Sequence, residues 1–147
     1  MALSCWPPIA LTALVVRHEG RCHCGAIGVE FDSAIALAPR QCQCGFCRRH
    51  NARMVSDPAG RVVISLAAEP RRYRFGTRTT DYLICGTCGV YVAAASEIGG
   101  RTYATVNLNL FDDPRLDLVA EPVSYEGETA EAKAERRLRK WTPARIA

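Results

Sequence analysis

The sequence predicts a mainly β protein of one domain, with a single helix near its C-terminus. Short segments rich in β-branched and aromatic residues recur along the chain and are separated by Gly, Pro or Asp, as expected of strands joined by turns. One segment close to the C-terminus is instead rich in the helix formers Ala, Glu, Lys and Arg. The length of 147 residues is close to the usual size of one domain.

The strand pattern appears in six segments. The last of them alternates in its second half, so that Val106, Leu108 and Leu110 share one face and Asn107 and Asn109 share the other. We therefore expect this strand to turn one face to the core and the other to water. The predicted strands are residues 26–31, 62–66, 72–75, 81–84, 90–94 and 101–110.

The helix is predicted over residues 130–141. Thr129 has the side-chain oxygen of a good N-cap, and Leu138 and Trp141 are spaced to pack against the sheet. The basic residues of this segment are interpreted as a solvated face rather than a binding patch. They are Arg136, Arg137, Arg139 and Lys140.

The charge pattern and the N-terminus indicate a cytoplasmic protein. The net charge is +4, but acidic residues are interspersed with the arginines, so neither a nucleic-acid partner nor a membrane partner is predicted. The apolar residues 7–16 are too few to span a bilayer and lack the pattern of a secretory signal, so we expect a loose leader or an edge strand. In a reducing compartment, clustered cysteines favour metal binding over disulfides.

Seven of the eight cysteines lie in three short loops, and Cys5 alone stands apart. Two cysteines separated by one or two residues can direct both sulfurs at one ion. Gly25 and Gly89, which follow two of the pairs, suit the positive φ of such turns. A disulfide within Cys-x-Cys would be strained, which argues against a disulfide framework. The loops contain Cys22 and Cys24; Cys42, Cys44 and Cys47; and Cys85 and Cys88.

Ligand counting assigns the cysteines to two metal sites. Structural zinc takes four ligands, which two loops of two cysteines supply together. A four-ligand site that used the middle loop and one neighbour would leave a thiolate over, whereas the first and third loops together leave none. The predicted structural zinc site is therefore formed by Cys22, Cys24, Cys85 and Cys88.

The middle loop is then a site of three thiolates, Cys42, Cys44 and Cys47, with one open position, which is typical of catalytic zinc. His50 is a candidate fourth ligand, although we favour a place for it outside the coordination sphere. Three thiolates leave the site with a net negative charge, which disfavours the activation of water. An incoming thiol that loses its proton on coordination suits such a site, so addition of a thiol to a small electrophile is predicted.

Three motifs of the chain are those of a known family. They read Gly20-Arg-Cys22-His-Cys24-Gly25-Ala-Ile, Cys42-Gln-Cys44-Gly-Phe-Cys47-Arg-Arg and Cys85-Gly-Thr-Cys88-Gly89. With them the chain resembles the glutathione-dependent formaldehyde-activating family, whose relatives include centromere protein V. The resemblance extends over about residues 18–110. It implies a β-tent fold, the complex β-sheet fold with zinc knuckles also found in methionine-R-sulfoxide reductases.

The resemblance also implies a division of the chain and a chemistry. Residues 1–17 are expected to be a leader and residues 18–147 a zinc-binding domain of this family. Two zinc ions per chain are implied: a structural one on the first and third loops, and an exchangeable catalytic one on the middle loop. The implied activity is that of a carbon–sulfur lyase, which joins glutathione and formaldehyde into S-hydroxymethylglutathione.

Two basic residues beside the open site, Arg48 and Arg49, are predicted to bind the carboxylates of a glutathione-like ligand. The alternative is that they are solvated or paired with acidic residues such as Asp57. The activity has alternatives as well. One is a zinc module without catalytic activity that binds a partner, and the other is metal-free redox chemistry at Cys44 or Cys47.

Overall fold

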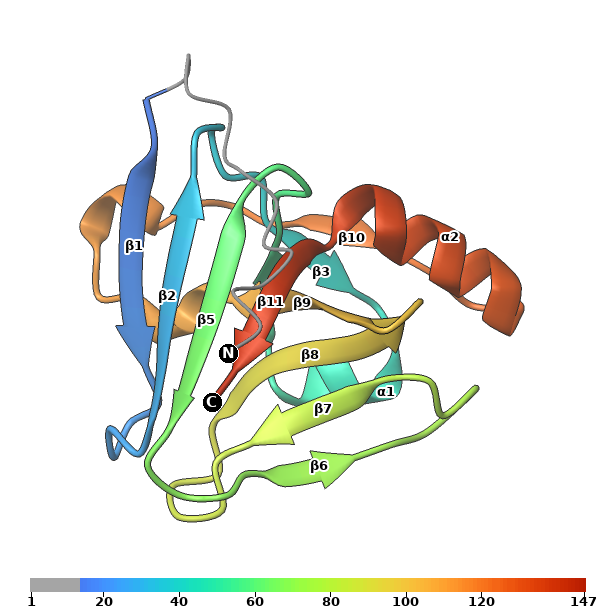
Figure 1. The fold of residues 1–147 in the computed structure, drawn as a ribbon, viewed down its shortest axis with the longest axis horizontal. Coiled ribbons are helices and arrows are strands. Elements are labelled where there is room, and N and C mark those ends of the chain that lie inside the picture. The colour runs from blue at the N-terminus through green and yellow to red at the C-terminus, as the bar shows by residue number, and fades with distance from the viewer. Residues whose placement is uncertain (1–13) are drawn as a thin grey trace.

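The computed structural model describes residues 14–147, in which eleven β-strands join in one sheet (Figure 1). The strands are β1 (Val16–Arg21), β2 (Ile27–Ser33), β3 (Arg40–Cys42), β4 (Met54–Val55), β5 (Arg61–Leu66), β6 (Arg71–Tyr73), β7 (Asp81–Ile84), β8 (Tyr91–Ile98), β9 (Arg101–Asn107), β10 (Glu121–Val123) and β11 (Thr142–Ile146). Their order is β1-β2-β5-β11-β9-β4-β3-β10. Beside this path, β8 pairs with β9, β7 pairs with β8, and β6 pairs with β7. The predicted mainly β fold is confirmed.

The main core lies against β2 and β5, which run side by side in Figure 1. Alternate residues of β2 point inward, so that Ile27, Val29 and Phe31 are at most 2% exposed. In the antiparallel register Val62 of β5 lies opposite Phe31, and Ile64 lies opposite Val29, and both are fully buried. The β1–β2 turn and the β2–β5 pair therefore rest on one continuous apolar layer.

The hairpin of β8 and β9 links this core to the other end of the sheet. Gly99 and Gly100 form its turn with φ values of 60° and 78°, the positive φ pair that two-residue hairpin turns require. Ala93 and Val106 face each other in the register, and both are fully buried. β7 then pairs along β8, which places the turn between these two strands beside the β1–β2 turn (Figure 1).

The predicted strand 101–110 is correct only as far as Asn107. There the chain enters a 3₁₀ turn, Leu108–Leu110, which the side chain of Asn107 caps by accepting from Asn109 N at 3.1 Å. Asn107 is 3% exposed and donates to the Tyr91 carbonyl oxygen at 3.0 Å. The prediction that Asn107 faces water is therefore wrong, because its amide satisfies the backbone at the point where the strand ends.

The C-terminal helix α2 spans Ala130–Lys140. Thr129 caps it as predicted, because its Oγ1 accepts from Ala132 N at 3.1 Å. Trp141 is buried, but Leu138 is 45% exposed and does not anchor the helix. The interpretation of a solvated basic face is wrong for Arg136 and Arg137, which are 9% and 4% exposed. Both arginines line a cavity that α2 covers.

Shorter helices complete the described chain. α1 comprises Gly45–Arg49 and follows β3 directly, and a second 3₁₀ turn, Pro114–Leu116, precedes β10. β1 begins at Val16, two residues ahead of the predicted start of the domain at residue 18. Residues 1–13, which include Cys5 and most of the predicted leader, lie outside the described residues, so the division of the chain stays a prediction.

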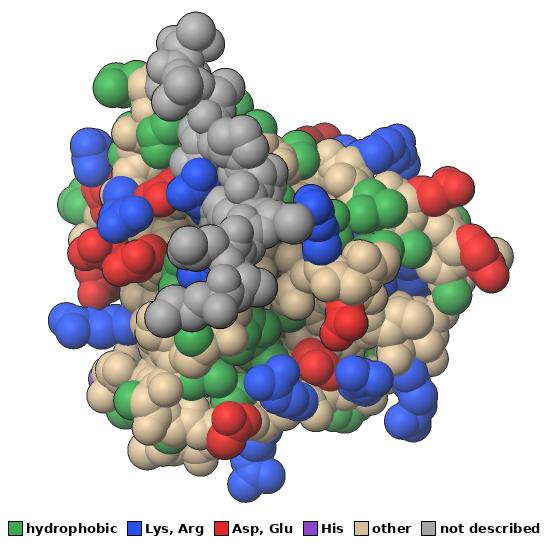
Figure 2. Space-filling model, viewed as in Figure 1, with side chains coloured by type: hydrophobic (Ala, Val, Ile, Leu, Met, Phe, Trp, Pro, Cys, Tyr) green, Lys and Arg blue, Asp and Glu red, His purple; other side chains and the backbone are tan. Residues whose placement is uncertain are grey.

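Within residues 14–147, no helix is long and apolar enough to cross a membrane. On the face drawn in Figure 2, basic and acidic side chains are interspersed rather than gathered by sign.

Candidate metal centres

The first cysteine cluster joins two turns that lie far apart in the sequence. Cys22 and Cys24 lie between β1 and β2, and Cys85 and Cys88 lie between β7 and β8. Backbone N–H groups point at two of the sulfurs: Ile27 N donates to Cys22 Sγ at 3.3 Å, and Cys88 N donates to Cys85 Sγ at 3.5 Å. Such bonds stabilise thiolates, so each turn is built to present charged sulfur.

The geometry of this cluster fits a tetrahedral zinc ion. All four sulfurs lie within 4.8 Å of one another. Cys24 Sγ is 3.7 Å from Cys22 Sγ and 3.6 Å from Cys85 Sγ. Zinc–sulfur bonds of about 2.3 Å in a tetrahedron require sulfurs roughly 3.8 Å apart. Cys22 and Cys85 are buried in the main core, so an ion here would connect that core to both turns.

Gly89 shapes the second of these turns. Its φ is 79°, and its N–H donates to the Cys85 carbonyl oxygen at 2.9 Å. Gly89→Ala is expected to lower the free energy of unfolding of the metal-loaded protein by about 1–2 kcal/mol, the cost of a left-handed conformation for a residue with a Cβ. Urea denaturation followed by tryptophan fluorescence measures this loss.

Gly86→Ala is the matched control in the same turn. Gly86 has no positive φ, and a Cβ there would stand 3.7 Å from the Glu69 carbonyl oxygen, an ordinary contact. We expect this variant to unfold like the wild type within about 0.5 kcal/mol. Equal losses in the two variants would contradict the role assigned to φ at Gly89.

The second cluster lies at the junction of β3 and α1. Cys42 ends β3, Cys44 is the N-cap of α1, and Cys47 is the third residue of this five-residue helix. Their three sulfurs are within 4.8 Å of one another, and Cys47 N donates to Cys44 Sγ at 3.4 Å. The short helix thus folds the spacing Cys-x-Cys-x-x-Cys into a triangle of sulfurs. Cys47 is buried, and the other two cysteines are half-buried.

The electrostatics of this triangle favour a cation. Hydrogen bonds from Cys42 and Cys47 lower the pKa of Cys44 to about 2, and those with Cys42 and Cys44 raise the pKa of Cys47. One thiolate is thus stabilised by protonated neighbours, because sulfurs this close repel one another when they are all charged. A divalent ion removes that repulsion and permits all three to ionise. The donor set therefore fits a soft metal such as zinc.

His50 does not belong to either cluster in the described chain. It caps the end of α1, and its ring packs on Phe46 with centroids 4.6 Å apart and on Tyr91 with centroids 5.5 Å apart. The favoured place for His50 outside the coordination sphere stays a prediction. The His50 ring instead continues an aromatic wall around Phe46, whose centroid is 4.7 Å from Tyr82 and 4.9 Å from Tyr91.

A cavity of about 580 Å³ opens beside the three-sulfur cluster. This volume is in the range of small-molecule sites. Its apolar part includes Met54, Phe75, Tyr82, Tyr91 and Trp141. Its charged part has four basic residues and one acidic residue, which are Arg40, Lys133, Arg136, Arg137 and Glu126.

Two of the tyrosines that line the cavity, Tyr82 and Tyr91, remain protonated. Burial raises the pKa of Tyr82, and the thiols of Cys47 and Cys44 raise it further, while Arg137 opposes the shift. Burial and Cys47 likewise raise the pKa of Tyr91. The charges of the sulfur cluster and of Arg137 thus both act on Tyr82, which presents a neutral phenol to the cavity.

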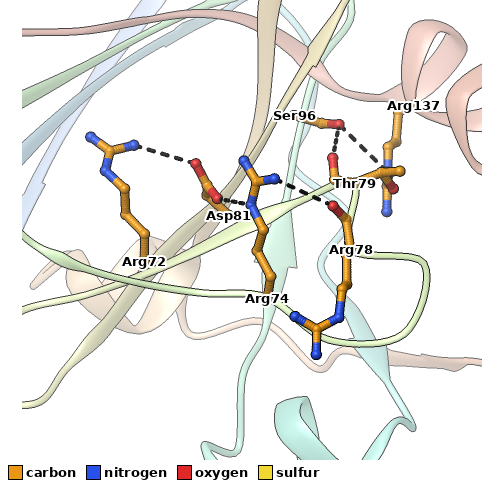
Figure 3. A network of polar contacts seen from close by, with 7 residues as sticks. All are labelled: Arg72, Arg74, Arg78, Thr79, Asp81, Ser96 and Arg137. Atoms are coloured by element: carbon orange, nitrogen blue, oxygen red, sulfur yellow. Dashed lines mark hydrogen bonds and ion pairs between the residues drawn. The ribbon is translucent and has the colours of Figure 1, made fainter.

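α2 reaches the β6–β7 loop through Arg137 (Figure 3). Arg137 Nη1 donates to Thr79 Oγ1 at 2.8 Å and to Ser96 Oγ at 3.5 Å. Ser96 in turn donates to the Thr79 carbonyl oxygen at 2.6 Å. On the other side of the loop Asp81 accepts from Arg74 Nε at 2.6 Å. The loop that contributes Phe75 to the cavity is thus held from both sides.

The structure brings the predicted cysteine ligands together but leaves the two predicted ligand-binding arginines outside the cavity. The seven cysteines form the two expected clusters and are free thiols. Arg48 and Arg49 are exposed and do not line the cavity, and Arg49 Nη1 donates to the Gly45 carbonyl oxygen at 2.9 Å. Their role as ligand-binding residues stays a prediction. Sequence reasoning assigns Arg137 to a solvated face and does not single out Lys133, although their spacing of four places both on one helix face.

Comparison with known proteins gives two matches. A family described as "Glutathione-dependent formaldehyde-activating enzyme" matches residues 17–125. A crystal structure of a Rhodobacter sphaeroides protein is similar to this chain with a TM-score of 0.54 and 28% sequence identity. The similarity covers 71% of this chain and 99% of that one.

Proposed function

Because the chain belongs to the glutathione-dependent formaldehyde-activating enzyme family, we propose that it is a zinc-dependent carbon–sulfur lyase that joins a thiol to a small aldehyde. Glutathione and formaldehyde are the proposed pair, and the proposed setting is the cytoplasm. The observation that carries the proposal is the triangle of Cys42, Cys44 and Cys47 beside a cavity of about 580 Å³.

The two clusters have different roles in this proposal. Cys22, Cys24, Cys85 and Cys88 hold a structural zinc with four ligands, and Cys42, Cys44 and Cys47 hold a second zinc with three. When bound there, the second ion supplies a position at which an incoming thiol ionises. Its three ligands come from one loop, so we expect this ion to exchange more readily than the structural one.

The reaction needs neither an oxidant nor a reductant. The thiol sulfur forms a bond to the aldehyde carbon, the carbonyl π electrons move to oxygen, and the thiol proton ends on that oxygen. The product from formaldehyde is a hydroxymethyl thioether. The chain contributes proximity, because the cavity holds both reactants beside the sulfur cluster. The rings of Phe75, Tyr82 and Tyr91 line the cavity, and Tyr82 packs against both of the others.

NMR exchange spectroscopy tests this function. Formaldehyde, glutathione and their adduct interconvert unaided, so the measured quantity is the exchange rate with and without zinc-loaded protein. We expect the rate to rise in proportion to protein concentration and to return to the uncatalysed value with Cys47→Ser. An unchanged rate with a protein that holds two zinc ions would instead favour a zinc module without catalytic activity.

A further inference from the structure

Two basic residues of the cavity share one face of α2. Lys133 and Arg137 are four positions apart, which places them one turn from each other on the same side of the helix. Arg137 is 4% exposed, whereas Lys133 is half-buried with its ammonium beside Gly76 of the β6–β7 loop. A row of positive charge therefore runs along the cavity wall.

The neighbouring Arg136 is already neutralised. Its Nε lies 3.1 Å from both carboxylate oxygens of Glu128, and its guanidinium stacks on the ring of Tyr125 at 3.6 Å. Glu126, the acidic residue of the cavity wall, is exposed and forms no ion pair with Lys133 or Arg137. Arg136 thus stabilises the start of α2, and its charge is not available to a ligand.

Arg137 has no carboxylate partner within residues 14–147. Its Nη1 donates to the neutral hydroxyl groups of Thr79 and Ser96, and its Nε is buried without any hydrogen-bond partner (Figure 3). A buried guanidinium with unsatisfied donors is costly unless an anion completes it. Arg137 lines the cavity, and a guanidinium suits the two oxygens of one carboxylate. Burial also lowers the pKa of Arg137, though arginine keeps its charge at physiological pH.

α2 lies beyond the part of the chain that matches the family, which ends at residue 125. These two cations are therefore a feature of this chain's own C-terminal segment rather than of the matched region.

We propose that Lys133 and Arg137 form a carboxylate-binding subsite that selects acidic thiols over neutral ones. The proposal rests on the proposed function, because it assumes that the thiol end of the ligand lies at the sulfur cluster. Arg137 binds the carboxylate at depth, and Lys133 adds charge nearer the mouth. A ligand with a thiol at one end and a carboxylate at the other spans the cavity from β3 to α2.

Calorimetric binding to zinc-loaded protein tests this subsite with two probes, 3-mercaptopropionate and 3-mercaptopropanamide. They share the thiol and differ in the carboxylate. We expect the wild type to bind the acid about tenfold more tightly than the amide, the effect of a charge-assisted hydrogen bond. Arg137→Met should abolish this preference and Lys133→Met should reduce it. Arg139→Met, an exposed change on the same helix, should leave it intact.

The Lys133 variant keeps the test valid if Arg137→Met fails to fold, because Lys133 has no side-chain partner to lose in the described chain. Equal binding of both probes by the wild type overturns the subsite and leaves the proposed function standing. Binding of neither probe overturns both. A preference that survives in the α2 variants but disappears in an Arg48→Met, Arg49→Met double variant overturns the proposal and assigns the carboxylate to α1.

Discussion

Cys85→Ser is expected to unfold the domain. Cys85 is 2% exposed and belongs to the main core, and its sulfur lies 3.6 Å from the Cys24 sulfur across 61 positions of sequence. A structural zinc contributes roughly 10–16 kcal/mol of apparent binding free energy in small zinc-binding peptides at neutral pH. A domain of this size has a total stability of only about 5–15 kcal/mol. Loss of a ligand thus removes an amount of free energy comparable with the whole stability.

The measurement is near-UV circular dichroism with metal analysis of the freshly purified protein. We expect Cys85→Ser to lose its near-UV signal and its cooperative thermal transition. Excess chelator at elevated temperature should have the same effect on the wild type, since it removes the same ion. A folded Cys85→Ser protein with a wild-type melting temperature would contradict a structural role for this cluster.

The strands with a strong local pattern could be predicted from sequence, and the others could not. The segment from Asp81 to Ile84 was predicted at its observed bounds, because its pattern is carried by its own side chains. β4 has two residues and β11 contains Pro143, which a strand interior normally excludes. Such strands exist because partners hold them: β11 pairs with β5 on one side and with β9 on the other.

The candidate site also has parts that could be predicted from the sequence and parts that could not. The sulfur clusters could be predicted because each is set by spacings of one or two residues and by the ligand number of zinc. The cavity could not, because Met54, Tyr82 and Trp141 come together only in the folded sheet. The composition of α2 predicts a solvated basic face, because composition does not reveal that Arg136 and Arg137 line a cavity.

Cys44→Ser is expected to do the opposite of Cys85→Ser: the protein stays folded and loses its chemistry. Cys44 is the N-cap of α1, where its sulfur accepts from Cys47 N, and serine is among the best residues for that position. α1 should therefore persist, and the free energy of unfolding should change by no more than about 1 kcal/mol. The first cluster shares no ligand with this loop, so one zinc ion per chain should remain.

The lost function follows from ligand number. Two thiolates bind zinc more weakly than three, so the second ion should be absent from purified Cys44→Ser, and thiol–formaldehyde exchange should fall to the uncatalysed rate. Metal content, thermal melting and the NMR exchange rate, measured on Cys44→Ser and Cys85→Ser together, separate the two clusters. Because the clusters share no loop, equal destabilisation of both variants can arise only if the middle loop also supports the fold. That result would overturn the division into a structural and a reactive site.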